Sequence, residues 1–368
     1  MAHALAAVHT EPKKALEIRE YPVLSAPEGS LRLDLTISGI CGTDIHIIEG
    51  CLAIPAVFIP GHEFIGTVAE QGKGATKDGL GSKLEEGNAV IACVALPCGT
   101  CFSCQHGETA SCLNFGVSNI RDPKDAPHFF GGFAEALFQP AKTCVKIPAK
   151  LDIEAVSALP CAGPTAIRAF DFAGNLQGDE LVVVQGTGPV GLFAIAWAAK
   201  AGCRVVAIGS GGTPARTAAA KQLGASEVLD YRAMPEASRL ERIQAIAKEM
   251  GRGNGADVVF EASGSPKAVP EGLNLVRTLG RYIIPGQYSS SGEVAIKPEL
   301  ITFKAIKIIG SGQYKLSDIK TYLDFLKDNA DLQAELKSLI SHRFAVKDAN
   351  AAIETVSGGK AVKAVFVK

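Results

Sequence analysis

The chain of 368 residues carries 37 Lys and Arg against 38 Asp and Glu, which gives a formal net charge of −1, and 47% of its residues are hydrophobic. This composition is typical of a globular protein large enough for two domains, and it excludes the fibrous and disordered classes. The sequence has no basic stripe, no apolar run of about eighteen residues and no signal-peptide pattern at its start. We therefore expect a cytoplasmic protein that acts on a small molecule, with no nucleic-acid or membrane partner.

Residues 1–160 are predicted to form a β-rich first domain. Short β-branched runs at 31–39, 64–70 and 88–96 are separated by stretches that contain Gly and Pro. Such runs are typical of strands joined by frequent turns.

Residues 161–300 alternate between strand and helix patterns. Short apolar runs predict strands at 181–186, 204–209, 226–231, 256–263 and 281–286. The stretches between them predict helices at 189–202, 214–225 and 267–280, and another that ends near 251. Strands separated by helices require crossover connections, so this α/β segment predicts a doubly wound parallel sheet of the Rossmann type.

Residues 301–368 are predicted to return to the first domain and complete it. This segment carries strand patterns at 307–312 and 363–368 and a helical pattern at 316–329.

Four cysteines form a compact metal-binding pattern with the spacing C-x2-C-x2-C-x7-C. They are Cys98, Cys101, Cys104 and Cys112. Four thiolates at this spacing close tetrahedrally on one zinc ion and leave no open coordination position, so the site is predicted to stabilise a lobe of backbone. The alternative of chance clustering or disulfides is disfavoured, because C-x2-C pairs form disulfides poorly and the chain is expected to be intracellular.

Other cysteines and histidines lack such a context. We interpret Cys51, Cys93, Cys144 and Cys203 as small buried hydrophobic residues. Surface or structural roles are expected for His9, His106, His128 and His342.

A glycine-rich motif follows the strand at 181–186 and opens the next helix. It consists of Gly186, Thr187, Gly188, Pro189, Val190 and Gly191. The first glycine permits a tight turn, the second lets the backbone approach a pyrophosphate, and the third permits close packing of helix on strand. In this context the G-x-G-x-x-G spacing predicts a dinucleotide at the helix N-terminus, with a purely structural glycine turn as the alternative.

The strand at 204–209 ends without the carboxylate that an NAD site usually presents to the adenosine ribose. Gly209 and Ser210 stand at that point, and Ser210, Thr213 and Arg216 are candidate partners for a 2′-phosphate. The cofactor is therefore predicted to be NAD or NADP. In the NAD interpretation, Arg216 only begins a solvated helix face and NAD binds through backbone contacts.

A second set of metal-compatible residues is spread along the chain. Cys41 begins the motif CGTDIH, His62 lies in PGHE, and Cys161 lies in LPCAGPTA. Three such ligands that converge would leave a fourth position open on a zinc ion, as catalytic zinc sites do.

Together these motifs resemble the zinc-dependent alcohol dehydrogenases of the medium-chain dehydrogenase/reductase family, over nearly the whole chain. The resemblance implies a GroES-like catalytic domain, a Rossmann coenzyme domain and a homodimer or homotetramer. It further implies that Cys41, His62 and Cys161 bind the catalytic zinc and that Thr43 and His46 pass the substrate proton to solvent. Asp44 and Glu63 match positions that surround this zinc, and Val94 and Phe133 match positions that line the substrate pocket, although core packing explains both equally well.

The expected reaction is the reversible oxidation of an alcohol, secondary or cyclic in the first instance, to a ketone or aldehyde with hydride transfer to NAD(P). Zinc favours loss of the alcohol proton, and a histidine with a pKa near neutrality suits a proton relay. Two alternatives are a metal-independent NADPH carbonyl or enone reductase of the same fold and a non-enzymatic zinc- and dinucleotide-binding redox sensor. The joint presence of Cys41, His62 and Cys161 argues against the first, and Thr43 and His46 argue against the second.

Overall fold

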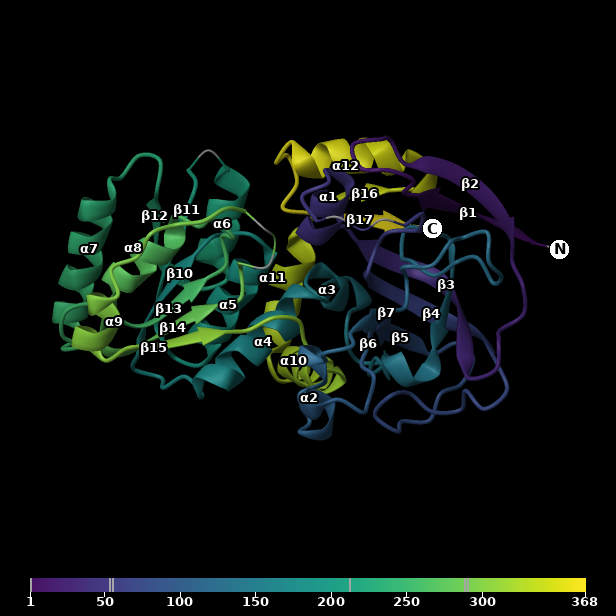
Figure 1. The fold of residues 1–368 in the computed structure, drawn as a ribbon, viewed down its shortest axis with the longest axis horizontal. Coiled ribbons are helices and arrows are strands. Elements are labelled where there is room, and N and C mark those ends of the chain that lie inside the picture. The colour runs from purple at the N-terminus through teal and green to yellow at the C-terminus, as the bar shows by residue number, and fades with distance from the viewer. Residues whose placement is uncertain (1, 53, 55, 212, 288, 290) are drawn as a thin grey trace. The chain divides into compact units, whose positions relative to one another are not determined.

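The chain forms two compact units (Figure 1). The computed structural model describes residues 2–52, 54, 56–211, 213–287, 289 and 291–368. The first unit consists of Met1–Cys161 and Gln313–Lys368, and the second unit is Ala162–Gly312.

The first unit is built on a mostly antiparallel sheet. It joins strands of the N-terminal segment to two strands near the C-terminus. The strand order is β16 (Ile340–Phe344), β17 (Lys363–Val367), β3 (Ser30–Gly39), β4 (Glu63–Gln71), β5 (Ala89–Ala92) and β9 (Cys144–Lys146), and β8 (Ala136–Pro140) also pairs with β3. A hairpin of β1 (His3–Val8) and β2 (Glu17–Pro22) and a short pair, β6 (Ala95–Leu96) and β7 (Gly116–Val117), complete the strands. Alternate residues of β3 are fully buried, as expected for a strand with one face in the core.

Helices of the first unit are short until the C-terminal segment. They are α1 (Gly42–Ile48), α2 (Phe102–Gln105), η1 (Thr109–Ser111), η2 (Ala141–Thr143), α3 (Ile153–Ala158), α10 (Leu316–Asp328), α11 (Ala330–Ser338), η3 (Val346–Asp348) and α12 (Ala349–Ser357). Helix α11 packs on α3, and α12 packs on β17. The C-terminal segment therefore contributes both a strand and packing helices to this unit.

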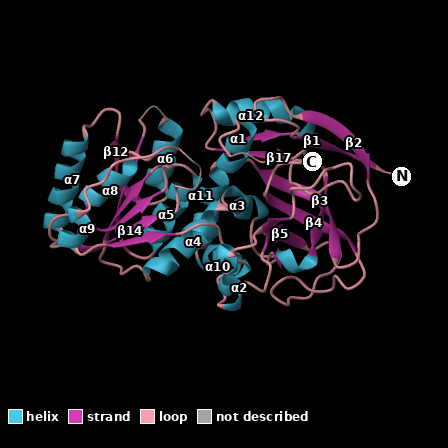
Figure 2. Ribbon diagram, viewed as in Figure 1, coloured by secondary structure: helices cyan, strands magenta, loops and turns pink. Residues whose placement is uncertain are grey.

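The second unit is a parallel sheet covered by helices on both faces (Figure 2). Its strand order is β12 (Ala225–Asp230), β11 (Arg204–Gly209), β10 (Leu181–Gln185), β13 (Ala256–Glu261), β14 (Val276–Ile284) and β15 (Lys307–Gly310). Every residue of the central strands β10 and β13 is buried, because helices shield both faces of the sheet. This order confirms the doubly wound fold that the sequence predicts.

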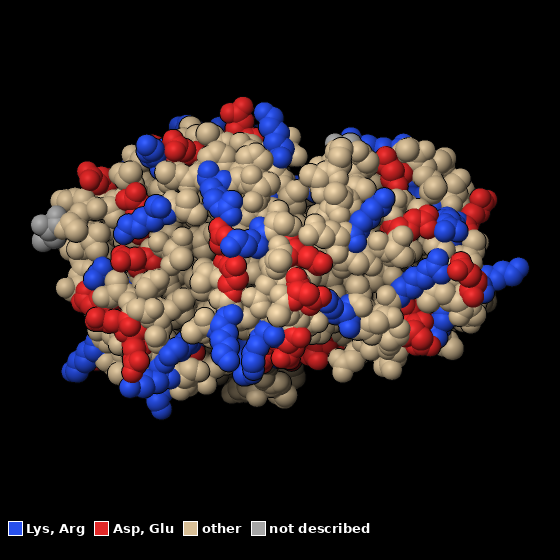
Figure 3. Space-filling model, turned by 180° about the vertical axis from the view of Figure 1, so that it is seen from behind, with Lys and Arg blue, Asp and Glu red and all other residues tan. Residues whose placement is uncertain are grey.

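The helices of the second unit form two layers. One contains α4 (Ala162–Ala173), α5 (Pro189–Lys200) and α6 (Pro214–Gln222), and the other contains α7 (Glu236–Glu249), α8 (Ala268–Leu275) and α9 (Glu299–Lys304). Within the described residues, no helix is long and apolar enough to span a bilayer. Basic and acidic side chains are interspersed over the face in Figure 3, as the near-zero net charge suggests.

Two sequence predictions about this unit are wrong in detail. The predicted helix at 267–280 ends at Leu275, and β14 begins at Val276. The helix ends where Val276 becomes extended and pairs with Ala256 of β13. The Lys304 ammonium donates to the carbonyls of Leu273, Asn274 and Val276 at 2.8, 2.8 and 2.9 Å and so satisfies this end.

The return to the first unit also begins later than the predicted residue 301. Strand β15 pairs in parallel with β14, with Tyr282 opposite Ile308. This backbone pairing keeps α9 and β15 in the second unit, and the first unit resumes at Gln313.

A buried carboxylate joins three segments of the second unit. The Asp257 side chain is fully buried and accepts hydrogen bonds from the Leu181 amide at 2.8 Å, from Arg252 and from Arg277. Burial alone would raise the pKa of Asp257, but the hydrogen bonds from Arg252, Leu181 and Arg277 outweigh it and lower this pKa.

We expect Asp257→Asn to lower the free energy of unfolding by about 3 kcal/mol at pH 7, because it breaks a buried ion pair. The folded-state pKa of Asp257 is depressed, so its stabilisation is complete above the unfolded-state value of about 4 and is lost as the pH falls below that value. Urea unfolding at pH 7 and at about pH 3 should therefore show the gap between variant and wild type shrinking in acid. The control is Asp179→Asn, an exposed partner of Arg252, which should cost little. A gap that is the same at both pH values would contradict this account.

Candidate active site

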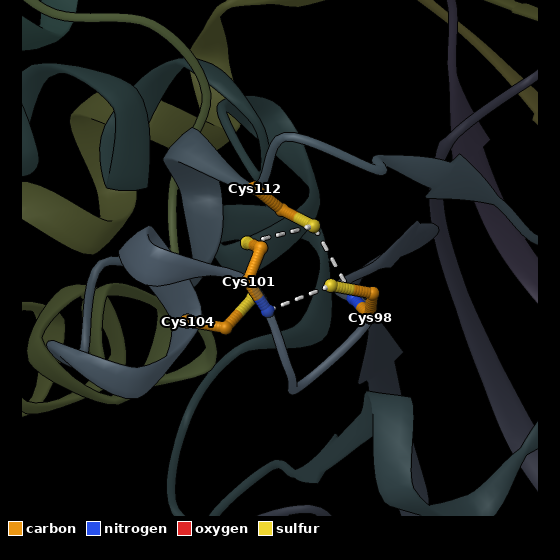
Figure 4. Close-up of side chains that lie close together, drawn as sticks. All are labelled: Cys98, Cys101, Cys104 and Cys112. Carbon is orange, nitrogen blue, oxygen red and sulfur yellow. Dashed lines mark hydrogen bonds between the residues drawn. The ribbon is translucent and has the colours of Figure 1, made fainter.

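The four-cysteine lobe brings its thiols together as the spacing predicts (Figure 4). The sulfurs of Cys98, Cys101, Cys104 and Cys112 lie within 4.8 Å of one another. The Cys101 and Cys112 sulfurs are 3.9 Å apart, close to the roughly 3.8 Å edge of a tetrahedron with zinc–sulfur bonds of about 2.3 Å. The donor set and its geometry fit a closed zinc site.

Backbone amides of the lobe already favour thiolates. The Cys98 amide donates to the Cys112 sulfur at 3.3 Å, and the amides of Cys101 and Leu113 donate to the sulfurs of Cys98 and Cys101 at 3.4 Å each. Hydrogen bonds from the Thr100 amide, the Thr100 hydroxyl and the Cys101 amide lower the pKa of Cys98 to about 5. Burial raises the pKa of Cys104 to about 12.

A second cluster contains the three residues that the family resemblance assigns to the catalytic zinc. Ligand atoms of Cys41, His62 and Cys161 lie within 4.8 Å of one another, and a carboxylate oxygen of Glu63 lies in the same group. Cys41 immediately precedes α1, His62 and Glu63 stand at the start of β4, and Cys161 immediately precedes α4. Two thiols and an imidazole suit zinc, and they leave room for a fourth donor.

Asp44 connects the two segments that carry Cys41 and His62. Its carboxylate is almost fully buried and accepts from the Cys41 amide at 2.9 Å and from the Gly61 amide at 3.1 Å. The other contact is with His62 Nδ1, 3.4 Å from Asp44 Oδ1. With Nδ1 turned to a carboxylate, Nε2 is the nitrogen available to a metal ion.

The titratable groups of this cluster shift one another strongly. Burial lowers the pKa of His62, but the charges of Asp44 and Cys41 outweigh it and hold this pKa well above its usual value. A hydrogen bond from Cys161 and the charge of His62 hold the pKa of Cys41 well below its usual value. The hydrogen bond between Cys41 and Cys161, together with burial, raises the pKa of Cys161. Burial raises the pKa of Glu63 to about 7.

The predicted relay residues lie on one face of α1. Thr43 and His46 are three positions apart in this helix and are both half-buried. The Thr43 hydroxyl lies 3.6 Å from the Cys41 sulfur. A hydroxyl next to a metal ligand and an imidazole one turn further suit the transfer of a proton away from the site.

The glycine-rich turn between β10 and α5 has the geometry of a phosphate site. Gly186 has φ of +106°, and a Cβ there would lie 2.8 Å from the Ser263 amide nitrogen. A Cβ at Gly191 would lie 1.9 Å from the Gly186 carbonyl oxygen. A Cβ at Gly188, the N-cap of α5, would have no described atom within 4 Å, so a ligand can approach its backbone.

The end of β11 carries the residues expected to contact the adenosine part of the cofactor. Arg216 is the third residue of α6 and is half-buried, and burial lowers its pKa. Thr187 fills the space beside Gly209, since a Cβ at Gly209 would lie 2.8 Å from the Thr187 methyl group. Ser210 continues the chain beyond β11, and Thr213 precedes α6.

Sequence reasoning missed Asp230 at the end of the neighbouring strand. Asp230 is opposite Gly209 in the sheet register and accepts from the Arg232 amide at 2.9 Å. A Cβ at Gly211 would lie 2.2 Å from the Asp230 carboxylate, so this acidic group borders the loop after β11. Its position as the last residue of β12 was the available signal, because the carboxyl ends of parallel strands share one edge.

Other assigned residues differ in burial. Phe133 is fully buried and stacks edge-on against Phe366, with ring centroids 4.7 Å apart, so it packs in the core. Val94 is half-buried and packs against the same core. The prediction of burial is confirmed for Cys93, Cys144 and Cys203 and wrong for Cys51, which is exposed in the turn after α1.

Comparison with known proteins gives a consistent family assignment. Residues 27–149 match the model of an alcohol dehydrogenase GroES-like domain, and residues 189–328 match that of a zinc-binding dehydrogenase. The chain is 33% identical to 5-exo-hydroxycamphor dehydrogenase of Pseudomonas putida over 371 residues, which covers 100% of this chain and 99% of the relative.

Solved structures agree with these matches. An alcohol dehydrogenase of Thermotoga maritima superposes with a TM-score of 0.90 at 29% identity and full coverage of both chains. A Sinorhizobium meliloti protein described as a zinc-binding dehydrogenase, solved with NADP bound, gives a TM-score of 0.84 at 25% identity, again over both full chains.

The two clusters predict different responses to the loss of one thiol. We expect two zinc ions per purified chain and one in either Cys101→Ser or Cys41→Ser. Cys101→Ser should also lower the melting temperature by roughly 10 °C, because a closed metal site contributes folding energy. Metal analysis and thermal unfolding measure both effects, with Cys144→Ser, a buried thiol outside both clusters, as the control. If Cys101→Ser kept two zinc ions, the lobe assignment would be wrong.

Proposed function

Since the chain belongs to the zinc-dependent alcohol dehydrogenases of the medium-chain dehydrogenase/reductase family, we propose that it oxidises a secondary or cyclic alcohol reversibly to the ketone, with NAD or NADP as hydride acceptor. The observation that carries this proposal is the grouping of Cys41, His62 and Cys161, whose ligand atoms lie within 4.8 Å of one another. Zinc bound there would act as a Lewis acid that makes the alcohol a stronger acid.

The residues around this cluster have separate roles in the proposed reaction. Asp44 orients His62 through the 3.4 Å contact to Nδ1. The Thr43 hydroxyl would accept the alcohol proton while giving up its own proton toward His46, and His46 would release a proton to solvent. NAD(P), when bound, would supply the hydride acceptor: it would take the carbinol hydrogen with its two electrons, so that the alcohol is oxidised and the cofactor reduced.

Residues at the carboxyl edge of the second unit's sheet would hold the dinucleotide. Gly186, Gly188 and Gly191 would bind its pyrophosphate, together with the backbone at Thr187, Pro189 and Val190. Arg216 and Ser210 would favour a 2′-phosphate, whereas the Asp230 carboxylate would repel one. Because these groups oppose one another, both cofactors belong in the first test.

The proposed substrate class is supported by the similarity to 5-exo-hydroxycamphor dehydrogenase. Hydroxycamphor carries its hydroxyl on a carbon of a ring, so it is a cyclic secondary alcohol, and its dehydrogenase aligns over the whole of this chain. This supports cyclic secondary alcohols as the first substrates to test.

A panel of cyclic, secondary, primary and polyol substrates, assayed by absorbance of the reduced nicotinamide with NAD and NADP separately, tests the proposal. Cys41→Ser should lower kcat/KM at least about a thousandfold and leave the Kd for the reduced cofactor within about twofold, because the thiol would hold the metal that activates the alcohol and would not bind the dinucleotide.

Cys144→Ser serves as the control for the loss of a buried thiol and should retain turnover. Near-wild-type turnover of Cys41→Ser would favour a metal-independent reductase. No turnover of any substrate by protein with two zinc ions would favour the redox-sensor alternative.

The proposal includes a cytoplasmic homo-oligomer that forms through the edge of the second unit's sheet. Strand β15 ends that sheet, and Ile308 on it is 42% exposed. Phe303 of α9, which precedes this strand, is 84% exposed. Exposed apolar side chains next to an unpaired strand edge favour pairing with a second copy.

Phe303→Glu combined with Ile308→Lys should convert the oligomer to smaller species, because charges would be buried in the interface. Light scattering after size-exclusion chromatography measures the mass. Ile18→Lys, an exposed apolar residue of β2 in the first unit, should leave the mass unchanged. An unchanged mass for the double variant would place the interface elsewhere.

A further inference from the structure

A buried lysine lies against the cluster of Cys41, His62 and Cys161. Lys363 is the first residue of β17, and its side chain is only 2% exposed. Its ammonium forms an ion pair with the Glu63 carboxylate and lies 3.4 Å from the Ile40 carbonyl oxygen. A fully buried ammonium is costly, so its partners indicate what it does.

A glycine allows this lysine to reach across a neighbouring strand. In the sheet, Val365 of β17 is opposite Gly39 of β3, and Gly39 is opposite Glu63 of β4. A Cβ at Gly39 would lie 2.5 Å from a Glu63 carboxylate oxygen and 2.8 Å from Lys363 Cε and Nζ. The ion pair therefore crosses β3 at the position where that strand has no side chain.

Lys363 holds both segments that carry candidate metal ligands. Its contact with the Ile40 carbonyl is next to Cys41, and the Ile40 amide donates to the Ala364 carbonyl at 3.0 Å. Its contact with Glu63 is next to His62. One side chain of the last strand thus fixes two segments of the first domain more than 20 residues apart in sequence.

The Glu63 carboxylate is close enough to compete for the metal. One of its oxygens belongs to the group whose ligand atoms all lie within 4.8 Å. A buried carboxylate that loses its cation is strongly driven to find another, and the nearest alternative would be the metal ion. Binding there would give four protein ligands and a closed site, as in structural zinc sites.

We propose that Lys363 is a positioning residue that keeps the catalytic metal centre open, by binding the Glu63 carboxylate through the gap at Gly39 and holding it out of the fourth coordination position. The inference rests on the proposed function only in taking Cys41, His62 and Cys161 as metal ligands.

Cobalt(II), which reports its ligands through visible absorption, tests this inference in the full-length protein without any alcohol. The comparison is between wild type, Lys363→Arg, Lys363→Met and the double variant Lys363→Met with Glu63→Gln. Imidazole serves as the probe of an open coordination position.

In wild type and Lys363→Arg, imidazole should shift the visible bands. Lys363→Met should show different bands that imidazole does not shift, and should release cobalt to a chelator about tenfold more slowly, because Glu63 supplies a fourth ligand. The double variant, which lacks both the lysine and the carboxylate, should regain the wild-type bands and the imidazole response.

Lys304→Met provides the matched control, since it removes a partly buried lysine that caps α8 in the second unit. It should lose stability and keep the wild-type cobalt spectrum. If Lys363→Met does not fold, Gly39→Ala takes its place, because a Cβ at Gly39 closes the gap.

Wild-type bands with a normal imidazole response in Lys363→Met, or bands that stay altered in the double variant, would overturn the inference. These outcomes are independent of turnover: if no alcohol reacts but the spectra change as expected, the proposed reaction fails and the role of Lys363 stands.

Discussion

The geometry of the candidate metal centre depends on the contacts of one buried carboxylate, that of Asp44. It accepts hydrogen bonds from the amides of Cys41 and Gly61 and contacts His62. These contacts hold the loop that carries Cys41 next to the loop that carries His62. The two amide bonds fix the backbone of both loops, and the 3.4 Å contact with Nδ1 orients the ring of His62. A ligand set built on short loops requires such a contact, because loops alone position side chains loosely.

Glycines provide the corresponding constraint in both units. At Gly186 and Gly191 the close approach of strand, turn and helix leaves no room for a Cβ, and the result is an exposed helix N-terminus that suits a pyrophosphate. At Gly39 the missing side chain opens a passage between strands that Lys363 and Glu63 occupy. In each case the absence of a Cβ allows a close approach that any other residue would block.

Local spacing predicted much of this architecture, and long-range contacts limited the rest. The four-cysteine lobe and the glycine-rich turn each lie within one short segment, so their spacing was enough. The role of Cys161 needed the family resemblance, because it is 99 residues beyond His62. The sequence predicted the start of the return segment several residues too early. Only the pairing of β15 with β14 shows that residues 307–310 belong to the second unit. Lys363 and Asp230 were missed because their significance comes from neighbouring strands, which sequence periodicity does not identify.

The two metal clusters differ in how they balance charge, and this difference separates their functions. In the lobe, four sulfurs lie close together and backbone amides donate to them, so a cation there would be surrounded by thiolates. In the other cluster the acidic groups are distributed: Asp44 is turned to His62, and Glu63 is paired with Lys363. Each of these carboxylates thus has a protein partner that holds it in place. Buried ion pairs in general add little net stability. The role of the Lys363–Glu63 pair is therefore to keep a coordination position free for substrate.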